Sequence, residues 1–151
     1  VEFPVLAPHV EARPFRYAYL SAHSSQAAAQ RELTDELAVI DVETGTHERV
    51  PFEPGCYPSE PIFVPNPAGG AGSANVNRST PKSKTAAGRP AESSAERDGW
   101  LLSLVYDAAK DQTACVVLDA ADPSERIATA WFEGRIPASF HGTWSPSSTD
   151  R

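Results

Sequence analysis

Residues 37–52 read "LAVIDVETGTHERVPF", and this stretch decides the fold. An apolar run rich in branched residues ends in Asp41, and a Gly-containing turn and a second strand-like run follow. Branched aliphatic residues bounded by Asp and Gly are typical of two β-strands joined by a tight turn. The pattern returns at residues 115–132, "CVVLDAADPSERIATAWF", with Asp119 in the corresponding place. The sequence therefore predicts a strand, turn and strand unit that occurs twice.

The spacing of the two units indicates the architecture. Asp41 and Asp119 lie 78 residues apart, and the interval includes a 32-residue segment, 66–97, of unusual composition. Discounting most of that segment leaves a period near the roughly 40 to 50 residues of a four-stranded propeller blade. We therefore predict one to two neighbouring blades of a β-propeller. A sandwich of seven strands is the competing hypothesis.

Further strand-like runs fill most of the chain outside the 32-residue segment. They are rich in Val, Ile, Leu and aromatic residues and end at Gly, Pro or Asp. The predicted strands cover residues 15–22, 36–45, 47–53, 60–65, 100–107, 113–120 and 126–133. Residues 24–33 have good helix propensity but no apolar stripe, which indicates an exposed loop with transient helical turns. The predicted fold class is all-β.

Residues 66–97 are rich in Gly, Ala, Ser and Pro and contain no aromatic residue, Leu or Ile. Such a segment buries too little apolar surface to offset the entropy lost on ordering, so we predict a disordered insertion. Its five basic and two acidic residues leave two interpretations, a basic docking arm or a tolerated surface insertion. Asn77 begins a formal glycosylation sequon, which lacks a secretory signal to give it meaning.

The composition excludes several classes of protein. A net charge of −7 argues against a nucleic-acid partner, because phosphate binding requires clustered Lys and Arg. The sequence has no apolar run of about 18 residues, as a membrane-spanning helix requires, and no signal peptide, so we expect a cytoplasmic protein. Cys56 and Cys115 lack metal-ligand spacing and are expected to be free thiols. The chain begins with Val1 and contains no Met, which predicts a piece of a longer polypeptide.

Several motifs together resemble the C-terminal portion of the carotenoid cleavage oxygenase family, also called the retinal pigment epithelial membrane protein family. The most specific are "SEPIFVP" at 59–65 followed by "DGWLLSLVYD" at 98–107, and "FHGTW" at 140–144. The resemblance covers nearly all of the chain outside residues 66–97. It implies a seven-bladed propeller with a non-haem Fe(II) held by four histidines, with glutamates behind them. Such enzymes use O2 to cleave a conjugated double bond of a carotenoid or apocarotenoid, or in one branch isomerise a retinyl ester.

The resemblance assigns two residues. His141 matches the last of the four iron ligands, and Glu60 matches a glutamate that accepts a hydrogen bond from the far nitrogen of an iron-bound histidine. Taken alone, His141 also fits a structural role in a turn, and Glu60 a solvated acid before a strand. We expect Phe140 and Trp144 to keep the site dry and Gly142 to permit a close backbone approach. The remaining histidines match no ligand and are expected in surface turns: His9, His23 and His47.

Four functional hypotheses follow. The first is the C-terminal part of a carotenoid dioxygenase whose other three iron ligands lie upstream, so that this chain alone is inactive. The second is an isomerohydrolase of the same family. The third is a propeller-derived binding module without iron, and the fourth is a truncated product without activity. The expected partners are a polyene and O2, together with a peripheral membrane contact made by upstream regions.

Overall fold

The computed structural model describes residues 1–30, 33–67, 95–137 and 141–145. Within these ranges the chain forms nine β-strands and two short 3-10 helices. The strands are β1 (Glu2–Val5), β2 (Tyr17–Ala22), β3 (Glu36–Asp41), β4 (Thr46–Pro51), β5 (Cys56–Pro58), β6 (Ile62–Pro65), β7 (Gly99–Asp107), β8 (Gln112–Asp119) and β9 (Arg126–Trp131). The helices are η1 (Pro8–Val10) and η2 (Ala28–Gln30). The predicted all-β class is confirmed.

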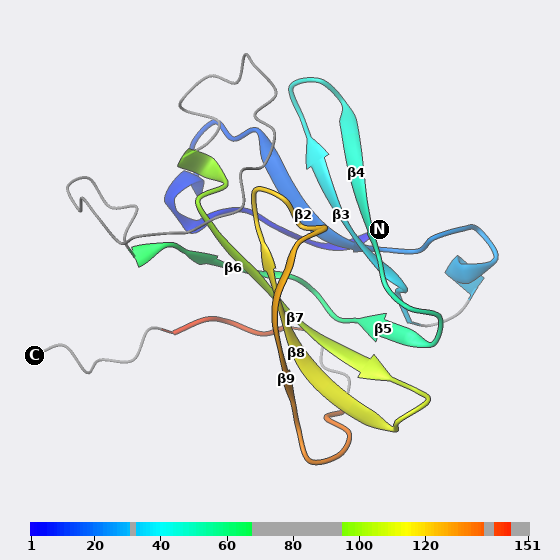
Figure 1. Cartoon of the computed structure of the whole chain (residues 1–151). Helices are drawn as coiled ribbons and strands as arrows, with labels where there is room; N and C mark the ends of the chain where they lie inside the picture. Colours follow the sequence, from blue (N-terminus) through cyan, green and yellow to red (C-terminus); the bar gives the residue numbers. More distant parts are fainter. Residues whose placement is uncertain (31–32, 68–94, 138–140, 146–151) are drawn as a thin grey trace, which may run out of the picture.

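The strands form two antiparallel sheets, which Figure 1 shows in blue to cyan and in green to orange. Sheet A has the order β1-β2-β3-β4, and sheet B has the order β5-β7-β8-β9 with β6 also paired to β7. Consecutive strands therefore stay in one sheet. The Greek-key connections of a sandwich would instead move strands between sheets, so the observed path favours the blade hypothesis. The number of blades stays a prediction.

The hydrophobic core lies between the two sheets. β7 alternates between buried and half-buried residues along its whole length, because successive side chains of a strand point to opposite faces. The ring centroids of Tyr19 in sheet A and Phe63 in sheet B lie 5.6 Å apart. One buried cluster contains residues from both sheets, including Tyr19, Leu37, Val39, Val50, Phe63, Leu101, Val105, Val116 and Leu118. The sheets are therefore joined by a shared core.

The repeated unit of the sequence corresponds to two hairpins. Asp41 ends β3 before the turn to β4, and Asp119 ends β8 before β9. In each turn the Oδ1 atom of the aspartate accepts hydrogen bonds from backbone N–H groups two and three residues further on. This local bonding stabilises the turn directly after the strand. The two halves of the repeat therefore begin their turns in the same way.

Two strands escaped the sequence prediction, and the reason is local composition. β1 and β5 are short and contain proline, which lacks the N–H that a sheet ladder uses. The seven predicted strands are all present. Five are shorter than predicted, for example β3, which ends at Asp41, and β9, which ends at Trp131, whereas β7 and β8 each begin one residue earlier than predicted. In the expected loop 24–33, residues 28–30 form η2 with Ala28 buried. Residues 31–32 lie outside the described part.

The predicted disordered insertion, residues 66–97, is wrong at its C-terminal end. Glu96 and Arg97 are buried, at 8% and 4% exposure. The Glu96 carboxylate accepts hydrogen bonds from backbone N–H groups of β2 and of the residue before it, and the Arg97 Nε donates to a backbone carbonyl at 2.8 Å. Composition alone cannot show that these charges find buried partners. Residues 68–94, including the sequon at Asn77, lie outside the described residues.

Candidate metal-ligating site

The two residues singled out from the sequence, Glu60 and His141, lie in contact although 81 positions separate them in the chain. The His141 Nδ1 lies 3.1 Å from the Glu60 Oε2, and the Gly142 N–H donates to the Glu60 Oε1. The Glu60 side chain is 9% exposed, whereas that of His141 is 76% exposed. With Nδ1 as the donor, the lone pair of Nε2 is free to bind a metal ion. The arrangement fits a single imidazole ligand.

Gly142 lies close to the Ile62 side chain beside this contact. A Cβ at this position would lie 2.9 Å from the Cδ1 of Ile62, closer than ordinary van der Waals contact. The same Cβ would be 3.8 Å from the Glu60 Oε1. The predicted close backbone approach at Gly142 is therefore confirmed. One carboxylate receives two donors from adjacent residues, so the backbone and the imidazole are positioned together.

Ser59, the residue before Glu60, anchors this part of the chain to both sheets by hydrogen bonds. The Ser59 N–H donates to the carbonyl of Leu104 in β7 at 2.8 Å, and the Leu104 N–H donates to the Ser59 Oγ at 3.2 Å. The Ser59 carbonyl accepts from the hydroxyls of Ser21 in β2 and Ser103 in β7, at 3.1 and 3.0 Å. Ser21 and Ser103 are both almost completely buried. These three serines, which sequence reasoning missed, join both sheets directly beside Glu60.

Phe3 is a further residue of the site that the sequence did not reveal. Its ring lies 5.5 Å from that of His141, centroid to centroid, with an angle of 87° between the planes. Its φ of 53° is the left-handed region, which costs a bulky residue about 1–3 kcal/mol. Phe3, Glu2 and Glu60 line a cavity of about 330 Å³. Glu2 is therefore a second carboxylate at this cavity. The tertiary fold brings it near Glu60, which is far from it in the sequence.

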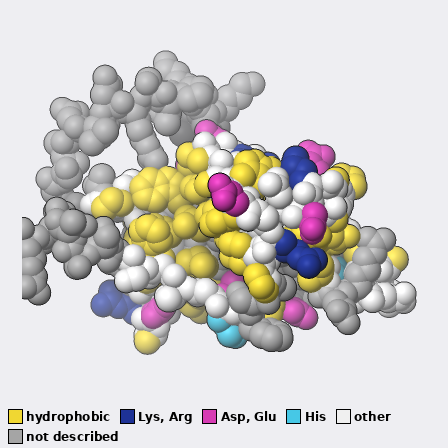
Figure 2. Space-filling view, turned by 90° about the horizontal axis from the view of Figure 1, so that it is seen from below, with side chains coloured by type: hydrophobic (Ala, Val, Ile, Leu, Met, Phe, Trp, Pro, Cys, Tyr) yellow, Lys and Arg dark blue, Asp and Glu magenta, His cyan; other side chains and the backbone are white. Residues whose placement is uncertain are grey.

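Glu60 also lines a larger apolar cavity of about 840 Å³. It is lined by residues of β6, β7 and β8 and of the C-terminal segment, among them Ile62, Val64, Trp100, Leu102, Val117 and Trp144. Trp144 is half-exposed, at 49%, and His141 is open to solvent. The expectation that Trp144 keeps the site dry stays a prediction, and Phe140 lies outside the described residues. Figure 2 shows that hydrophobic side chains form a broad patch on one face of the molecule.

The other histidines lie away from this pair or in different surroundings. His9 contacts Phe63 edge to face, with ring centroids 6.3 Å apart. His23 has a buried Nε2 that makes no hydrogen bond within the described ranges. His47 is exposed on β4, opposite Ile40. In the part of the chain that the structure describes, no group of three or more His, Cys, Asp or Glu side chains could hold a metal ion.

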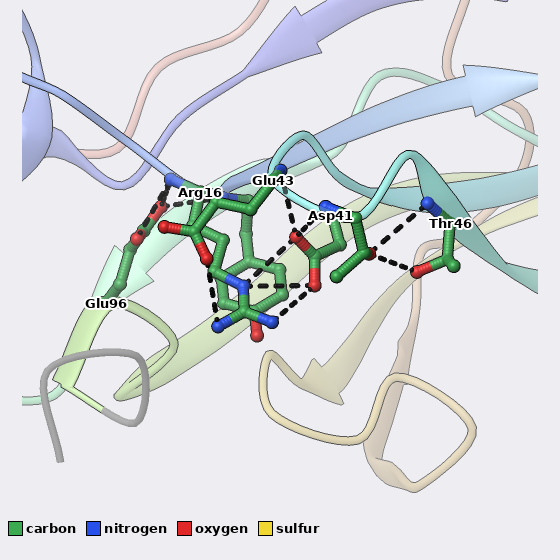
Figure 3. Close-up of polar contacts among 7 residues, drawn as sticks. Arg16, Asp41, Glu43, Thr46 and Glu96 are labelled. Carbon is green, nitrogen blue, oxygen red and sulfur yellow. Dashed lines mark hydrogen bonds and ion pairs between the residues drawn. The ribbon is translucent and has the colours of Figure 1, made fainter. Parts of the chain in front are cut away.

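A second polar cluster lies at the other end of β2, where Tyr17 pairs with Asp41 (Figure 3). The Arg16 Nε and Nη2 donate to the Asp41 carboxylate at 3.0 and 2.7 Å. This hydrogen bonding lowers the pKa of Asp41 to about 2. The Glu96 carboxylate accepts from the backbone N–H groups of Arg16 and Tyr17 at 2.9 and 2.8 Å. Glu96 lies just before β7 of sheet B and binds the start of β2 in sheet A, so this cluster links the two sheets.

Two further predictions from the sequence concern the cysteines and membrane-spanning helices. Cys56 and Cys115 are free thiols, as predicted. Burial raises the pKa of both thiols, so neither is activated as a nucleophile. Among the described residues, no helix is long and apolar enough to cross a bilayer.

The sequence matches the retinal pigment epithelial membrane protein family over residues 1–146. It is 35% identical over 146 residues to the apocarotenoid-15,15'-oxygenase of Synechocystis, covering 95% of this chain and 24% of that protein. It is 27% identical over 149 residues to the carotenoid cleavage oxygenase of Mycobacterium tuberculosis, covering 97% of this chain and 25% of that protein. The chain thus spans about a quarter of the length of these relatives.

Solved structures give the same result for the fold. A Glu150Asp mutant of the Synechocystis apocarotenoid oxygenase superposes with a TM-score of 0.72 at 33% identity, over 95% of this chain and 25% of that one. A cobalt-substituted form of the same oxygenase superposes with a TM-score of 0.71, also at 33% identity and with the same coverage. The fold of 95% of this chain therefore has a counterpart among solved structures.

Proposed function

Because the chain belongs to the retinal pigment epithelial membrane protein family, we propose that it forms part of a carotenoid-cleaving dioxygenase and supplies one ligand, His141, to a non-haem Fe(II). The observation that carries this proposal is the contact between the His141 Nδ1 and the buried Glu60 carboxylate. Metal-bound histidines commonly donate their second ring N–H to a carboxylate, which fixes the tautomer and orients the ring. The exposed Nε2 edge is then the ligand.

The names of the relatives support the proposed chemistry. They are oxygenases and dioxygenases that act on carotenoids or apocarotenoids. The cobalt-substituted relative indicates a metal centre that accepts a replacement ion in that protein. Ferrous iron, when bound, supplies the dioxygen chemistry that cleaves a conjugated double bond. The substrates of the proposed enzyme are therefore O2 and a carotenoid or apocarotenoid.

In that reaction the residues of this chain bind the metal and orient the ligand. The neutral imidazole of His141 binds through Nε2, and Glu60 keeps the proton on Nδ1. The Gly142 N–H shares the carboxylate, so the backbone next to the ligand is fixed as well. One imidazole does not hold ferrous iron alone. The remaining ligands are proposed to come from residues outside the described part, in the longer protein that the relatives' length suggests.

The two sheets fit this assignment as two neighbouring blades of a propeller. Each sheet is an antiparallel, up-and-down set of strands, which is how a blade is built. Glu60 lies between β5 and β6, the first two strands of sheet B, which both pair with β7, and Phe3 lies within β1, the first strand of sheet A. In a propeller the first strands of all blades surround the axis, where ligands from several blades can meet. We therefore propose that His141 faces this axis.

The proposal is tested in the complete protein that contains this chain. We expect His141→Ala to abolish iron retention, measured by elemental analysis after purification, together with O2-dependent cleavage of an apocarotenoid. Glu60→Gln should lower iron affinity or turnover by roughly 10- to 100-fold, the usual effect of a partner behind a ligand. His47→Ala, an exposed histidine on β4, is the matched control and should retain iron. Full iron occupancy and normal cleavage in His141→Ala would show that His141 is structural.

A further inference from the structure

β1 contains an irregularity where it passes the site. Glu2 pairs with Ser21 and Val5 pairs with Tyr19, so β1 has one residue more than β2 between the two pairs. This is a β-bulge, a feature that turns a side chain away from its regular direction. Phe3 lies in the bulge with a φ of 53°. The fold therefore holds a bulky aromatic residue in an unfavourable conformation at this position.

The reoriented side chain contacts His141. The two rings meet edge to face, with planes at 87° and centroids 5.5 Å apart. Such pairs are favourable because the positive edge of one ring meets the negative face of the other. Phe3 is half-buried whereas the His141 side chain is 76% exposed. Phe3 is thus a second partner of this imidazole, beside Glu60, among the described residues.

Glu60 and Phe3 restrain different motions of the His141 ring. The hydrogen bond between the Glu60 Oε2 and the His141 Nδ1 acts in the plane of the imidazole. A single such bond leaves the ring free to tilt about the line that joins the two atoms. The Phe3 ring, perpendicular to the imidazole, opposes that tilt. Strained backbone that brings a side chain to one target is an indication of function.

We propose that Phe3 is a positioning residue that fixes the tilt of the His141 imidazole and thereby keeps its Nε2 directed at the metal. This inference rests on the proposed function, since it assigns a purpose to the orientation of a ligand. Phe3 itself binds no metal. Its action is to hold the Nδ1–H in line with the Glu60 carboxylate. Loss of the Phe3 ring should therefore weaken that hydrogen bond while leaving the fold intact.

The test uses the complete protein that contains this chain, prepared without metal and with nitrogen-15 in its histidines. Nitrogen-15 NMR at a pH of about 8, where an ordinary imidazole is neutral, gives the ratio of the Nδ1–H to the Nε2–H tautomer of His141. We expect Phe3→Leu to lower this ratio by roughly 2- to 10-fold, the size of one edge-to-face contact. Phe3→Tyr keeps the ring edge and should restore the wild-type ratio. Backbone amide spectra of each variant report whether the fold is retained.

Three further variants make the result decisive. Phe3→Met is a second variant without a ring, should Phe3→Leu fail to fold. Phe15→Leu removes an exposed phenylalanine before the opposite end of β2 and should leave the ratio unchanged. Glu60→Gln, which offers one oxygen to two donors, should lower it. An unchanged ratio in both ringless Phe3 variants, with a lowered ratio in Glu60→Gln, would overturn the proposal. Because no metal takes part, this outcome is independent of iron retention in His141→Ala.

Discussion

Sheets A and B follow the same path, but their first strands differ from their later ones. The later strands form regular hairpins that turn at Asp41 in sheet A and at Asp119 in sheet B. The first strand of sheet A contains the bulge at Phe3, and that of sheet B is divided into β5 and β6 with Glu60 between them. Both irregularities lie beside His141. The regular hairpins thus build the fold, and the interrupted first strands build the site.

The largest expected effect tests whether the two sheets share one core. Leu37 in sheet A and Leu101 in sheet B are 2% and 1% exposed. We expect Leu37→Ala and Leu101→Ala each to lower the free energy of unfolding by about 2–5 kcal/mol, from lost burial and the cavity left behind. Urea denaturation should show one transition in both variants. Leu33→Ala, at a position 40% exposed, should cost less than about 0.5 kcal/mol.

The outcome that would break the comparison is a second transition. If one leucine variant unfolded in two steps while the other kept a single step, the sheets would be separate units. The first strands could then not position Glu60 and Phe3 against the same histidine. A similar loss of unfolding free energy in both variants, with one transition each, supports a single folding unit that contains both sheets.

The next effect concerns the connection between the sheets. The Glu96 carboxylate, located just before β7, accepts the backbone N–H groups of Arg16 and Tyr17 at the start of β2. We expect Glu96→Ala to lower the free energy of unfolding by about 1–3 kcal/mol, because buried N–H groups are left without acceptors. Thermal denaturation followed by circular dichroism measures the change. Glu125→Ala, an exposed carboxylate in the turn before β9, is the control. If both substitutions lowered the free energy of unfolding equally, the proposed connection of the sheets through Glu96 would be refuted.

The difference between hairpins and first strands also explains what the sequence could predict. The apolar runs around Asp41 and Asp119 are local patterns, and they predicted both hairpins and the all-β class. β1 and β5 contain proline and too few residues for a pattern. Phe3 reaches His141 only through the tertiary arrangement of the strands between them. Contacts across 138 residues leave no local signal, so Phe3 and the serines around Ser59 could not be predicted.

The pair Glu60 and His141 is an exception that the motifs supplied. Their role as carboxylate and ligand came from the resemblance to a family, and it stays a prediction. Their contact is a property of the structure. Glu96 shows the reverse case, because the composition of residues 66–97 predicted disorder at a position that is buried. The sequence of a polar segment does not show that one of its charged residues will bind backbone N–H groups far away in the chain.

A smaller effect distinguishes the two turn aspartates by pH. The Arg16 guanidinium lowers the pKa of Asp41 to about 2, from an ordinary value near 4. The stabilisation from this ionised carboxylate is fully present above about pH 4 and is lost as the pH falls through about 2. We therefore expect the stability difference between the wild type and Asp41→Asn to shrink between pH 5 and pH 2. Urea denaturation at each pH measures it, and a constant difference would contradict the ion pair.

The smallest expected effect concerns the other turn. The Asp119 Oδ1 accepts the backbone N–H groups of Ala121 and Asp122 at 2.7 and 3.3 Å. An asparagine has an oxygen in the same place and forms the same turn, so Asp119→Asn should change the free energy of unfolding by less than about 0.5 kcal/mol.

Asp41→Asn should cost more than Asp119→Asn at pH 7, because asparagine keeps the turn but cannot replace the ionised acceptor of Arg16. Alanine at either position removes the acceptor of the turn, so Asp41→Ala and Asp119→Ala should both be less stable than the corresponding asparagine variants. Urea denaturation of all four variants under one set of conditions gives the order. If Asp119→Asn proved as costly as Asp41→Asn, the turn aspartate of sheet B would have a charged partner of its own, and the two hairpins would be equivalent in their charges as well as in their path.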